Sequence, residues 1–282
     1  MTILDGNFLN KKINIFFIND MIKLSIITPT YNNINGLKRN IISVSKQSLK
    51  DKEHIIIDNL SIDGTDKLIN NYSKDAGYPV IFIREKDNGI YSAFNKGIKA
   101  AKGEWIHTLN SDDCYFDSEN LEILLNGDIK NFDILACAIL VKIEASSGSE
   151  NNLWVPSYNE KIKHYNFPHS GMIIKRSFYE LNGYYNENFK IVSDAIFTIQ
   201  NLPKAKYLIS NLPLIIMNSK GISNKFSFRR AFERIRCIIF YYDFPFNYKV
   251  KSIFLNCYRD LIMLLKLFRY KVKKRFQDFE LF

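Results

Sequence analysis

The chain has 282 residues and a formal net charge of +10, and 46% of its residues are apolar, 14% aromatic and 24% charged. This is the composition of a globular protein, and it excludes a wholly disordered or collagen-like chain. The length allows one large domain, alone or with an appendage, while four widely spaced cysteines without a CxxC pair exclude a disulfide framework and a zinc ribbon and favour a reducing compartment.

Residues 1–20 precede the first strong strand and are expected to be an N-terminal extension. Their apolar run at residues 13–18 is interrupted by Asn14 and lacks a small-residue cleavage site, so a signal peptide is not expected. Met21 stands just before the first strand. Residues 1–20 are therefore a dispensable extension, an overextended start or an ordinary N-terminal tail.

Short β-branched runs alternate with helical patterns over the first half of the chain. Strands are expected at residues 24–28, 54–58, 80–84 and 105–109, and helices near residues 37–44 and over 65–73 and 91–101. Strands separated by single helices imply right-handed crossovers and a mostly parallel sheet that is covered on both faces. The sequence therefore predicts an α/β fold.

The loops that follow these four strands are expected to meet. Ligands of parallel sheets collect at the carboxyl ends of the strands. Residues 28–33, 58–61, 84–91 and 110–113 should therefore converge on one cleft.

The second half is less regular. A long strand is expected over residues 133–141, then a polar loop over 144–152, further strands at 172–174 and 213–217, and a short helix over 194–201. In the tail, apolar side chains follow a 3.6-residue period that predicts a helix. They are Val250, Ile253, Phe254, Cys257, Leu261, Leu264 and Phe268.

Most of the positive charge lies in this tail. Residues 225–282 hold 14 Lys and Arg against 5 Asp and Glu, whereas residues 1–224 hold 25 against 24, and the tail also contains 16 of the 40 aromatic residues. Such a tail is expected to meet an anionic partner. No segment approaches the ~18 apolar residues of a membrane-spanning helix, and no nucleic-acid-binding motif accompanies the charge, so no nucleic-acid partner is expected.

The strongest candidate for chemistry is Asn110-Ser111-Asp112-Asp113, which follows the fourth strand. Adjacent carboxylates repel each other unless a cation or hydrogen-bond donors lie between them. Oxygen ligands of this kind suit Mg²⁺ or Mn²⁺, which also bind substrate phosphates. The alternative is a strand-terminating turn with an Asp cap for the next helix.

Three further acidic residues stand at expected strand or helix ends. Asp58 ends a strand, where it can accept hydrogen bonds from a nucleobase or ribose or be a solvated strand end. Asp87 precedes Gly89, which allows a positive φ or close ligand approach, although residues 87–97 contain neither a P-loop nor a GxGxxG fingerprint. Asp194 precedes an apolar helix, as a general base or as a helix cap.

In this order and spacing, the residues resemble the family 2 glycosyltransferases, which have the GT-A nucleotide-sugar fold. The resemblance rests on SIITPTYNN at residues 25–33, HIIIDNLSIDGT at 54–65 and EKDNGIYSAFNKGIKAAKGEWIHTLNSDD at 85–113, and it extends over residues 23–201. The last of these segments is similar to the branch of the family that builds bacterial surface polysaccharides of the O-antigen or capsule type.

The resemblance implies roles for single residues. Asp58 would contact the nucleobase, usually uracil, and Asp194 would match the family's catalytic base. Asp112 and Asp113 would bind Mn²⁺ or Mg²⁺ in the DxD region. The nucleotide-sugar would be bound by Asp58, Asp112 and nine further residues: Thr28, Pro29, Tyr31, Asn32, Asp87, Asn95, Lys96, Asn110 and Ser111.

Three positions depart from the family pattern. Asn110 stands where many relatives have the first Asp of DxD, and Asn59 replaces a frequent second Asp. Near the base, the common acidic pair is reduced to Ser193-Asp194. One carboxylate suffices for a base, so activity is still expected.

The resemblance implies an inverting, metal-dependent glycosyltransferase with a nucleotide-sugar donor, expected to be UDP-linked. The acceptor would be a glycan or a polyprenyl-diphosphate-linked saccharide. The GT-A catalytic domain would span residues 21–224. Residues 225–282 would form a helical region that meets an anionic membrane surface, and the protein would be cytoplasmic, on the inner face of the cytoplasmic membrane.

Three alternatives stay open. A sugar nucleotidyltransferase shares the α/β plan, but it is expected to carry a Gly-rich, basic loop where this chain reads TPTYNN. A catalytically silent membrane or assembly protein that retained the fold is compatible with Asn110 and with Ser193-Asp194. For the tail, the alternative is that its aromatic residues pack under the catalytic domain while its Lys and Arg are merely solvated.

Overall fold

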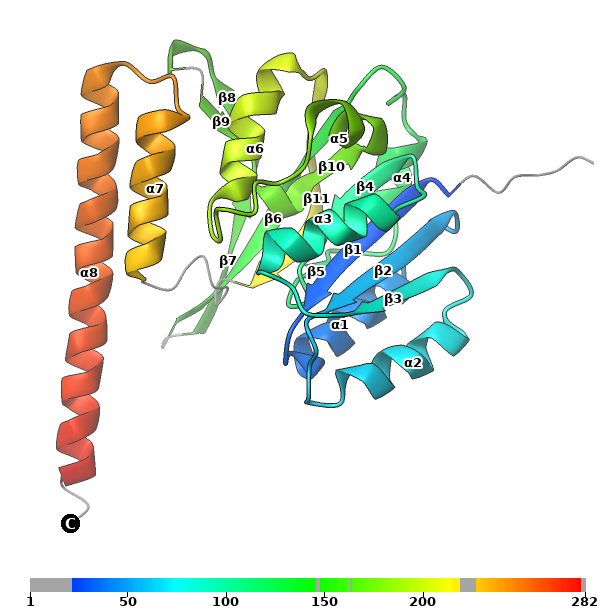
Figure 1. The fold of residues 1–282 in the computed structure, drawn as a ribbon, viewed down its shortest axis with the longest axis horizontal. Helices are drawn as coiled ribbons and strands as arrows, with labels where there is room; N and C mark the ends of the chain where they lie inside the picture. The colour runs from blue at the N-terminus through cyan, green and yellow to red at the C-terminus, as the bar shows by residue number, and fades with distance from the viewer. Residues whose placement is uncertain (1–21, 146–147, 163, 219–226, 280–282) are drawn as a thin grey trace, which may run out of the picture.

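The computed structural model describes residues 22–145, 148–162, 164–218 and 227–279 (Figure 1). The expected N-terminal extension, residues 1–20, lies outside the described residues. The strands and helices expected in the first half are present, with bounds that differ by a few residues. They are β1 (Leu24–Thr30), α1 (Ile34–Ser45), β2 (Lys52–Asp58), α2 (Thr65–Asp75), β3 (Val80–Arg84), α3 (Ile90–Ala100) and β4 (Trp105–Thr108).

These four strands are parallel and lie in the order β3-β2-β1-β4. Every residue of β1, β2 and β4 is buried, because helices cover both faces of the sheet. On β1, Ile27 packs towards Phe94 of α3, whereas Ile26 packs on the other face with Val44 of α1. Gly97 lets α3 approach β1 closely, since a Cβ there would lie 2.3 Å from Cγ2 of Ile27.

The second half extends the same sheet with strands of both directions. Its path continues from β4 through β10, β6 and β11 to β5; β10 is antiparallel to both neighbours, and β6 and β11 are parallel. The elements are β5 (Cys114–Tyr115), α4 (Asn120–Asn126), β6 (Ile134–Ala145), β7 (Gly148–Trp154), β8 (Ser157–Asn159), β9 (His164–Asn166), β10 (Met172–Lys175), α5 (Arg176–Asn182), α6 (Ser193–Asn201) and β11 (Tyr207–Asn218). The predicted α/β fold is confirmed as a mixed sheet between helices.

Two predictions for this half are corrected. In its described part, the stretch 144–152 is not the predicted polar loop, because residues 144–145 end β6 and residues 148–152 belong to β7, which pairs with β6 from Ile139↔Trp154 to Ala145↔Gly148. Its Asn and Glu residues predict a loop, but β7 lies off the main path of the sheet and pairs with β6, and such a strand accepts polar residues. The strand expected at 213–217 begins earlier, and the register shifts on either side of Pro213, an irregularity at which a strand can accept proline.

The C-terminal region forms two helices, α7 (Phe228–Phe240) and α8 (Phe246–Phe279), and α7 lies between α8 and the rest of the molecule (Figure 1). A buried ion pair between Arg230 of α7 and Asp260 of α8 joins them. The helix expected in the tail is therefore confirmed. None of the helices in the described part of the chain is long and apolar enough to cross a membrane.

Candidate active site

The loops after the parallel strands converge on one edge of the sheet, as predicted. After β1, the backbone N–H of Asn32 donates to Oγ of Ser61 at 2.8 Å, and Oδ1 of Asn32 accepts the N–H of Ile62 at 2.9 Å. Asn32 has a φ of +46°, a left-handed conformation that Asn tolerates better than most residues. Further along the same loop, Nδ2 of Asn33 reaches Oγ of Ser111 at 3.1 Å.

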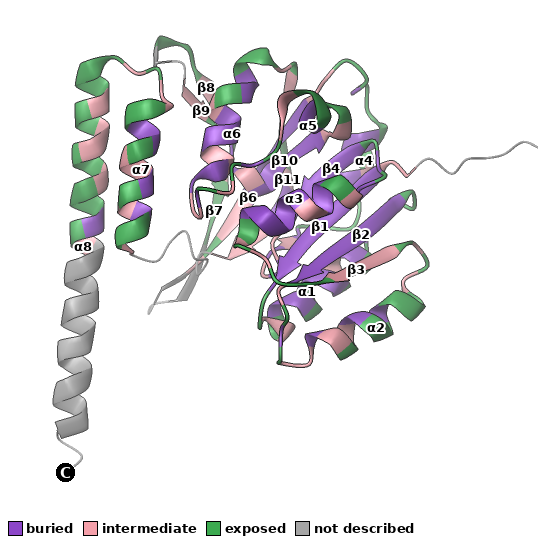
Figure 2. Ribbon diagram, viewed as in Figure 1, coloured by how far each residue is buried: buried purple, intermediate pink, exposed green. Residues whose placement is uncertain are grey.

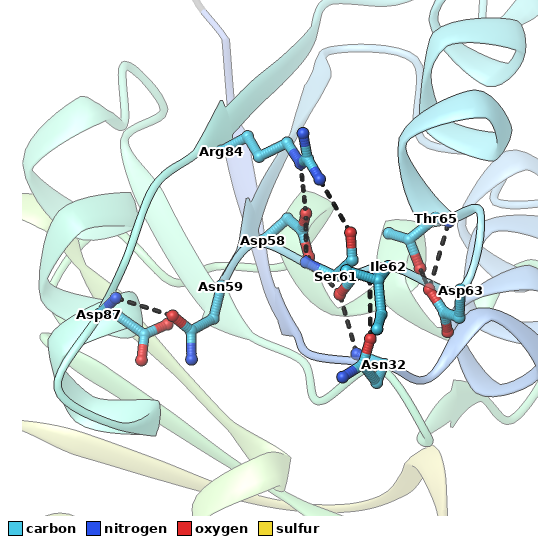
Figure 3. Close-up of polar contacts among 9 residues, drawn as sticks. All are labelled: Asn32, Asp58, Asn59, Ser61, Ile62, Asp63, Thr65, Arg84 and Asp87. Carbon is cyan, nitrogen blue, oxygen red and sulfur yellow. Dashed lines mark hydrogen bonds and ion pairs between the residues drawn. The ribbon is translucent and has the colours of Figure 1, made fainter.

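Asp58, at the end of β2, is fully buried and heavily hydrogen-bonded (Figure 3). Its carboxylate accepts the backbone N–H of Ser61 at 3.1 Å and the hydroxyl of Ser61 at 2.5 Å. Nε of Arg84, at the end of β3, donates to Oδ2 at 3.1 Å, and Nη2 of Arg84 donates to the carbonyl of Ser61 at 2.8 Å. Asp58 therefore fixes the β2–α2 loop, and its expected contact with a nucleobase stays a prediction.

The loop before α3 is attached to the loop after β2. The N–H of Asp87 donates to Oδ1 of Asn59 at 2.9 Å, and the N–H of Gly89 donates to Oδ1 of Asp87 at 2.8 Å. Burial raises the pKa of Asp87 above its usual value, although the Gly89 hydrogen bond and the charge of Lys96 oppose the rise. The φ of Gly89 is +113°, which confirms the predicted need for glycine.

Asn95 and Lys96 of α3 are engaged in contacts within the chain. The Asn95 amide donates to the carbonyl of Tyr185 and to the Glu187 carboxylate, both at 2.9 Å. Nζ of Lys96 lies 2.8 Å from the Glu85 carboxylate and 2.8 Å from the carbonyl of Lys86. These contacts attach α3 to residues 185–187 and to residues 85–86. The expected roles of Asn95 and Lys96 in binding the nucleotide-sugar stay predictions.

Three residues near the end of β1 that were expected to bind the nucleotide-sugar differ in exposure. Thr28 is fully buried, and its hydroxyl lies 2.9 Å from Nε2 of His54. Pro29 is buried within the strand. Tyr31 is 61% exposed and is the one of the three that offers a free ring surface to a ligand.

After β4, the Asn110–Asp113 turn contains one carboxylate that faces inwards and one that is partly exposed. Asp113 is buried, and it accepts hydrogen bonds from Nδ2 of Asn110 at 3.1 Å and from the N–H of Asn218 at 3.2 Å. Burial, and then the neighbouring charge of Asp112, raise the pKa of Asp113 to about 7. Nδ2 of Asn40 donates to the carbonyls of Asn110 and Asp113, both at 3.0 Å, and so fixes the turn.

The oxygen atoms of this turn fit a hard divalent cation. Asp112 is partly exposed, and Oδ1 of Asn110 is a buried acceptor without a hydrogen-bond partner among the described residues. Mg²⁺ and Mn²⁺ take carboxylate and amide oxygens and complete their coordination with water and substrate phosphates. No group of three or more His, Cys, Asp or Glu able to hold a metal occurs in the described part of the chain, so a cation here would depend on such outside ligands.

Asp194 lies in the first turn of α6, partly exposed, and accepts a hydrogen bond from Tyr91 at the start of α3. The Tyr91 hydroxyl lies 2.7 Å from Oδ1 of Asp194 and 2.9 Å from the carbonyl oxygen of Ile191. Nearby, Nε2 of His169 lies 2.8 Å from the Tyr185 hydroxyl, and burial lowers the pKa of His169. The start of α6 is thus attached to the helix that follows the Asp87 loop.

Sequence reasoning missed three residues that hold these groups: Ser61, Tyr91 and Glu233. Ser61 belongs to a loop that the motifs did cover, but a serine hydroxyl carries no sign of its partner. Tyr91 ends the 84–91 stretch that was expected in the cleft, but nothing in the sequence connects its hydroxyl with Asp194. Glu233 of α7 accepts the backbone N–H groups of Lys190 and Ile191, shortly before Asp194. It lies in the basic tail, and no spacing rule connects it with Asp194.

Comparisons with known proteins identify the family of the chain. Glycosyl transferase family 2 matches residues 25–197. A "PGL/p-HBAD biosynthesis glycosyltransferase" of Mycobacterium bovis (strain BCG / Pasteur 1173P2) is 23% identical over 218 residues, which cover 75% of this chain and 83% of the relative.

Two solved structures show the fold. S. aureus TarS 1-349 in complex with UDP-GlcNAc has a TM-score of 0.60 at 17% identity, over 82% of this chain and 70% of that chain. A longer TarS structure is covered over only 41% of its length. Mannosyltransferase PcManGT from Pyrobaculum calidifontis, in complex with GDP-Man and Mn²⁺, has a TM-score of 0.54 at 14% identity, over 77% and 61% of the two chains. Because the family match covers more than half of the residues, the chain belongs to glycosyl transferase family 2 and is a glycosyltransferase.

Proposed function

We propose that the protein transfers a sugar, with inversion, from a UDP-linked donor to a lipid-linked saccharide during assembly of a bacterial surface glycan. The observation that supports the proposal is the contact, at one sheet edge, between the loops that follow β1, β2, β3 and β4, the last of which contains the partly exposed Asp112. The partly exposed carboxylate of Asp194 is attached to the helix after the Asp87 loop through Tyr91. Membership of the family favours sugar transfer over the nucleotidyl transfer that the sequence had left open.

In this proposal Asp194 takes the proton from the acceptor hydroxyl that attacks the anomeric carbon. The hydroxyl of Tyr91 orients the carboxylate by donating to Oδ1. One base without a protein nucleophile gives a single displacement and therefore inversion at the anomeric carbon. With a divalent cation held at Asp112 and Asn110, the diphosphate would need no proton from a protein acid, in contrast to the two-carboxylate chemistry of glycosidases.

The donor would lie across the ends of β1, β2 and β4. Asp112, with Asn110 beside it, would hold Mn²⁺ or Mg²⁺, and the cation would neutralise the charge that develops on the diphosphate. Asp113, the second metal ligand that the resemblance implied, is buried and hydrogen-bonded to Asn110 and Asn218, so in this proposal it supports the turn that presents Asp112. Asp58 and the exposed ring of Tyr31 would meet the nucleoside.

The choice of donor and acceptor draws on the similar proteins. TarS holds UDP-GlcNAc and PcManGT holds GDP-Man with Mn²⁺, and the higher TM-score of TarS favours a uridine nucleotide. The mycobacterial relative is named for PGL/p-HBAD biosynthesis. By analogy, a glycan of the cell envelope, built on a polyprenyl diphosphate, is the proposed acceptor class.

The experiment is sugar transfer by the purified chain, with UDP, GDP and dTDP sugars, Mn²⁺ and lipid-linked acceptors. Asp194→Asn should lower kcat by about 100-fold or more, because the base is removed while the shape is kept. Asp112→Ala should weaken both donor binding and turnover. Asp75→Asn, at the exposed end of α2, is the matched control and should behave as wild type. If no member of the panel is turned over, the catalytically silent alternative is favoured instead.

The α7–α8 pair offers a surface for an anionic membrane. The described first half of α8 is largely exposed or intermediate (Figure 2). Its exposed apolar side chains recur at helical spacing. They are Phe246, Val250, Phe254, Tyr258 and Leu261. Lys251 is exposed at the edge of this stripe, whereas Asp260 is buried and pairs with α7. Aromatic and basic residues together match the interface of an anionic bilayer, so the protein would work on the inner face of the cytoplasmic membrane.

Flotation with vesicles tests this surface. The double variant Phe246→Ser, Phe254→Ser should lose binding to vesicles of phosphatidylcholine with phosphatidylglycerol, and high salt should weaken binding of the wild type. Leu181→Ser, which removes another exposed apolar side chain from α5, should bind like the wild type. Undiminished binding by the double variant would contradict the assignment. The assignment would also be contradicted if the wild type formed a dimer and did not bind the vesicles, and if the double variant no longer formed that dimer.

A further inference from the structure

A carboxylate from the C-terminal region holds the segment that leads into Asp194. Glu233 of α7 is only 5% exposed. Its two oxygens accept the backbone N–H of Lys190 at 3.0 and 3.1 Å, and one of them also accepts the N–H of Ile191 at 2.8 Å. Lys190 and Ile191 stand four and three residues before Asp194 in the chain.

The carbonyl of the same residue, Ile191, is held by Tyr91. The Tyr91 hydroxyl lies 2.9 Å from the carbonyl oxygen of Ile191 and 2.7 Å from Oδ1 of Asp194. The N–H of Ile191 is therefore fixed by α7, and its carbonyl meets the hydroxyl that donates to the carboxylate. A shift of the backbone at Ile191 would move its carbonyl, the Tyr91 hydroxyl and the Asp194 carboxylate relative to one another.

Packing and charge also place α7 against this segment. Cys237 of α7 lies in one buried apolar cluster with Phe189, Val192 and Ile196. The guanidinium of Arg236 lies 4.9 Å from the centre of the Phe189 ring. Burial raises the pKa of the Cys237 thiol to about 12, and the Asp194 charge adds to the rise, so the thiol lies within reach of that charge.

The same segment contacts the donor side of the site. Nζ of Lys190 donates to the carbonyl of Asn88 at 2.6 Å, in the loop between Asp87 and Gly89. The backbone that Glu233 holds is therefore connected to the donor-side loop through one side chain and to Asp194 through three residues of chain.

We propose that Glu233 is a positioning residue, which fixes the 189–192 segment and, through it, the carboxylate of Asp194. The assignment rests on the proposed function, because it gives Glu233 a role through the base. Burying a carboxylate is costly unless it is hydrogen-bonded. Here both oxygens are used on two consecutive backbone N–H groups, a charge-assisted pair that sets backbone position. Helix α7 is thereby part of the catalytic unit.

The first test is Glu233→Gln, which keeps the shape but turns an NH₂ group towards one of the two N–H groups. We expect kcat per folded molecule to fall by about 10- to 100-fold, as for a small displacement of a catalytic group, while the Kd for UDP stays within about 2-fold. Glu53→Gln is the matched control. It removes a buried carboxylate that accepts Lys102 N–H and Ser25 Oγ at the amino end of β2, and it should lower stability but not kcat.

A double-mutant cycle with Asp194→Asn separates positioning from a general structural effect. If Glu233 acts through Asp194, Glu233→Gln should cost less than about 3-fold once the base is gone. An equal cost in both backgrounds would overturn the proposal. If Asp194→Asn alone keeps the wild-type kcat, the proposed base is wrong, and that outcome is distinct from a failure of Glu233.

A measurement on the wild type covers the case in which Glu233→Gln does not fold. Amide hydrogen exchange of the full chain should show Lys190 and Ile191 protected, although both precede the first helical residue of α6. Exchange of these two amides at the rate of an exposed loop would show that Glu233 does not hold them, and the proposal would fall.

Discussion

The hydroxyl of Tyr91 donates to Oδ1 of Asp194 at 2.7 Å and so joins two residues that are 103 positions apart in the chain. Tyr91 begins the first turn of α3, and Asp194 lies in the first turn of α6. Burial, and then the charge of Asp194, raise the pKa of Tyr91 well above its usual value. The hydroxyl therefore stays protonated through the neutral range and remains a donor to the carboxylate.

Tyr91→Phe removes this donor and leaves the ring in place. We expect kcat to fall by about 10-fold, because the carboxylate loses its orientation, and the free energy of unfolding to fall by about 1 kcal/mol. Steady-state transfer and urea unfolding measure the two effects. Tyr78→Phe is the control: it removes a hydroxyl bonded to Tyr72 and Ser45 near the amino end of β3, so stability should fall without a change in kcat. Equal kcat values for Tyr91→Phe and wild type would show that the hydroxyl does not orient the base.

Ser61 connects the ends of β1 and β2 through a single hydroxyl (Figure 3). Oγ accepts the N–H of Asn32 and donates to Asp58. Ser61→Ala would leave that N–H unpaired and take one donor from a buried carboxylate, so we expect a loss of about 1–3 kcal/mol in the free energy of unfolding. The Kd for UDP should rise, because Asn32 and Asp58 both belong to the expected donor pocket.

Isothermal titration with UDP and urea unfolding check this prediction. Ser73→Ala removes an exposed hydroxyl that donates to the carbonyl of Asn70 on α2, and it should change neither quantity measurably. A Ser61→Ala variant with wild-type UDP affinity would show that the linkage between the two loops does not shape the nucleotide pocket.

The alternation of strands and helices in the first half could be predicted because two local signals agree there. Residues such as Ile55, Ile56 and Ile57 are buried on both faces of the sheet, so their strand is a continuous apolar run. In the second half the signals conflict. The ladder of β7 is built largely of polar residues, and β10 runs antiparallel to its neighbours, a direction that no local pattern specifies.

The site residues divide in the same way. Strand-end motifs predicted that the loops containing Asn32, Asp58, Asp87 and Ser111 would meet, because parallel topology alone brings them to one edge. The motifs did not indicate that Asp113 would be buried beneath Asp112, or that Glu233 would reach the backbone before Asp194. Both facts depend on which side chain turns inwards once distant segments have packed, and this is decided by tertiary contacts.

Gly89 is predicted to be irreplaceable for donor binding. Its φ of +113° lies in a region that is costly for residues with a side chain, and a Cβ would lie 3.4 Å from Cδ of Lys190. Gly89→Ala should lower the free energy of unfolding by about 1–3 kcal/mol. It should also raise the donor KM more than it lowers kcat, because the strained loop contains Asp87.

Gly77→Ala provides the comparison for backbone strain alone. Gly77 has a φ of +66° and no atom within 4 Å of the added Cβ, and it lies between α2 and β3. The free energy of unfolding of Gly77→Ala should be lower by about 1–2 kcal/mol, and its KM for the donor should be unchanged. If both variants raise KM equally, the effect arises from general destabilisation and not from the donor-side loop.

His107, inside β4, should make the protein sensitive to acid. It is fully buried, and its Nε2 donates to the carbonyl of Ser170 at 2.9 Å, which leaves Nδ1 to accept from the hydroxyl of Tyr115 at 2.8 Å. Burial, helped by the charge of His169, lowers its pKa to about 4. The unfolded chain takes up this proton near pH 6.5 and the folded chain only near pH 4, so stability is fully present above pH 6.5 and falls as the pH drops towards 4.

His107→Gln removes this proton and should reduce the slope of unfolding free energy against pH by up to about 1.4 kcal/mol per pH unit between the two pKa values. Urea unfolding at a series of pH values measures the slope. His54, whose pKa burial lowers to about 3, contributes in the same direction and should keep its share of the slope in the variant. His164→Gln is the control. This ring stacks on Tyr242 and is only half-buried, so its removal should change the slope less than His107→Gln does. An unchanged slope in His107→Gln would mean that the ring is already protonated in the folded protein, and the hydrogen bond from Tyr115 to Nδ1 could then not exist.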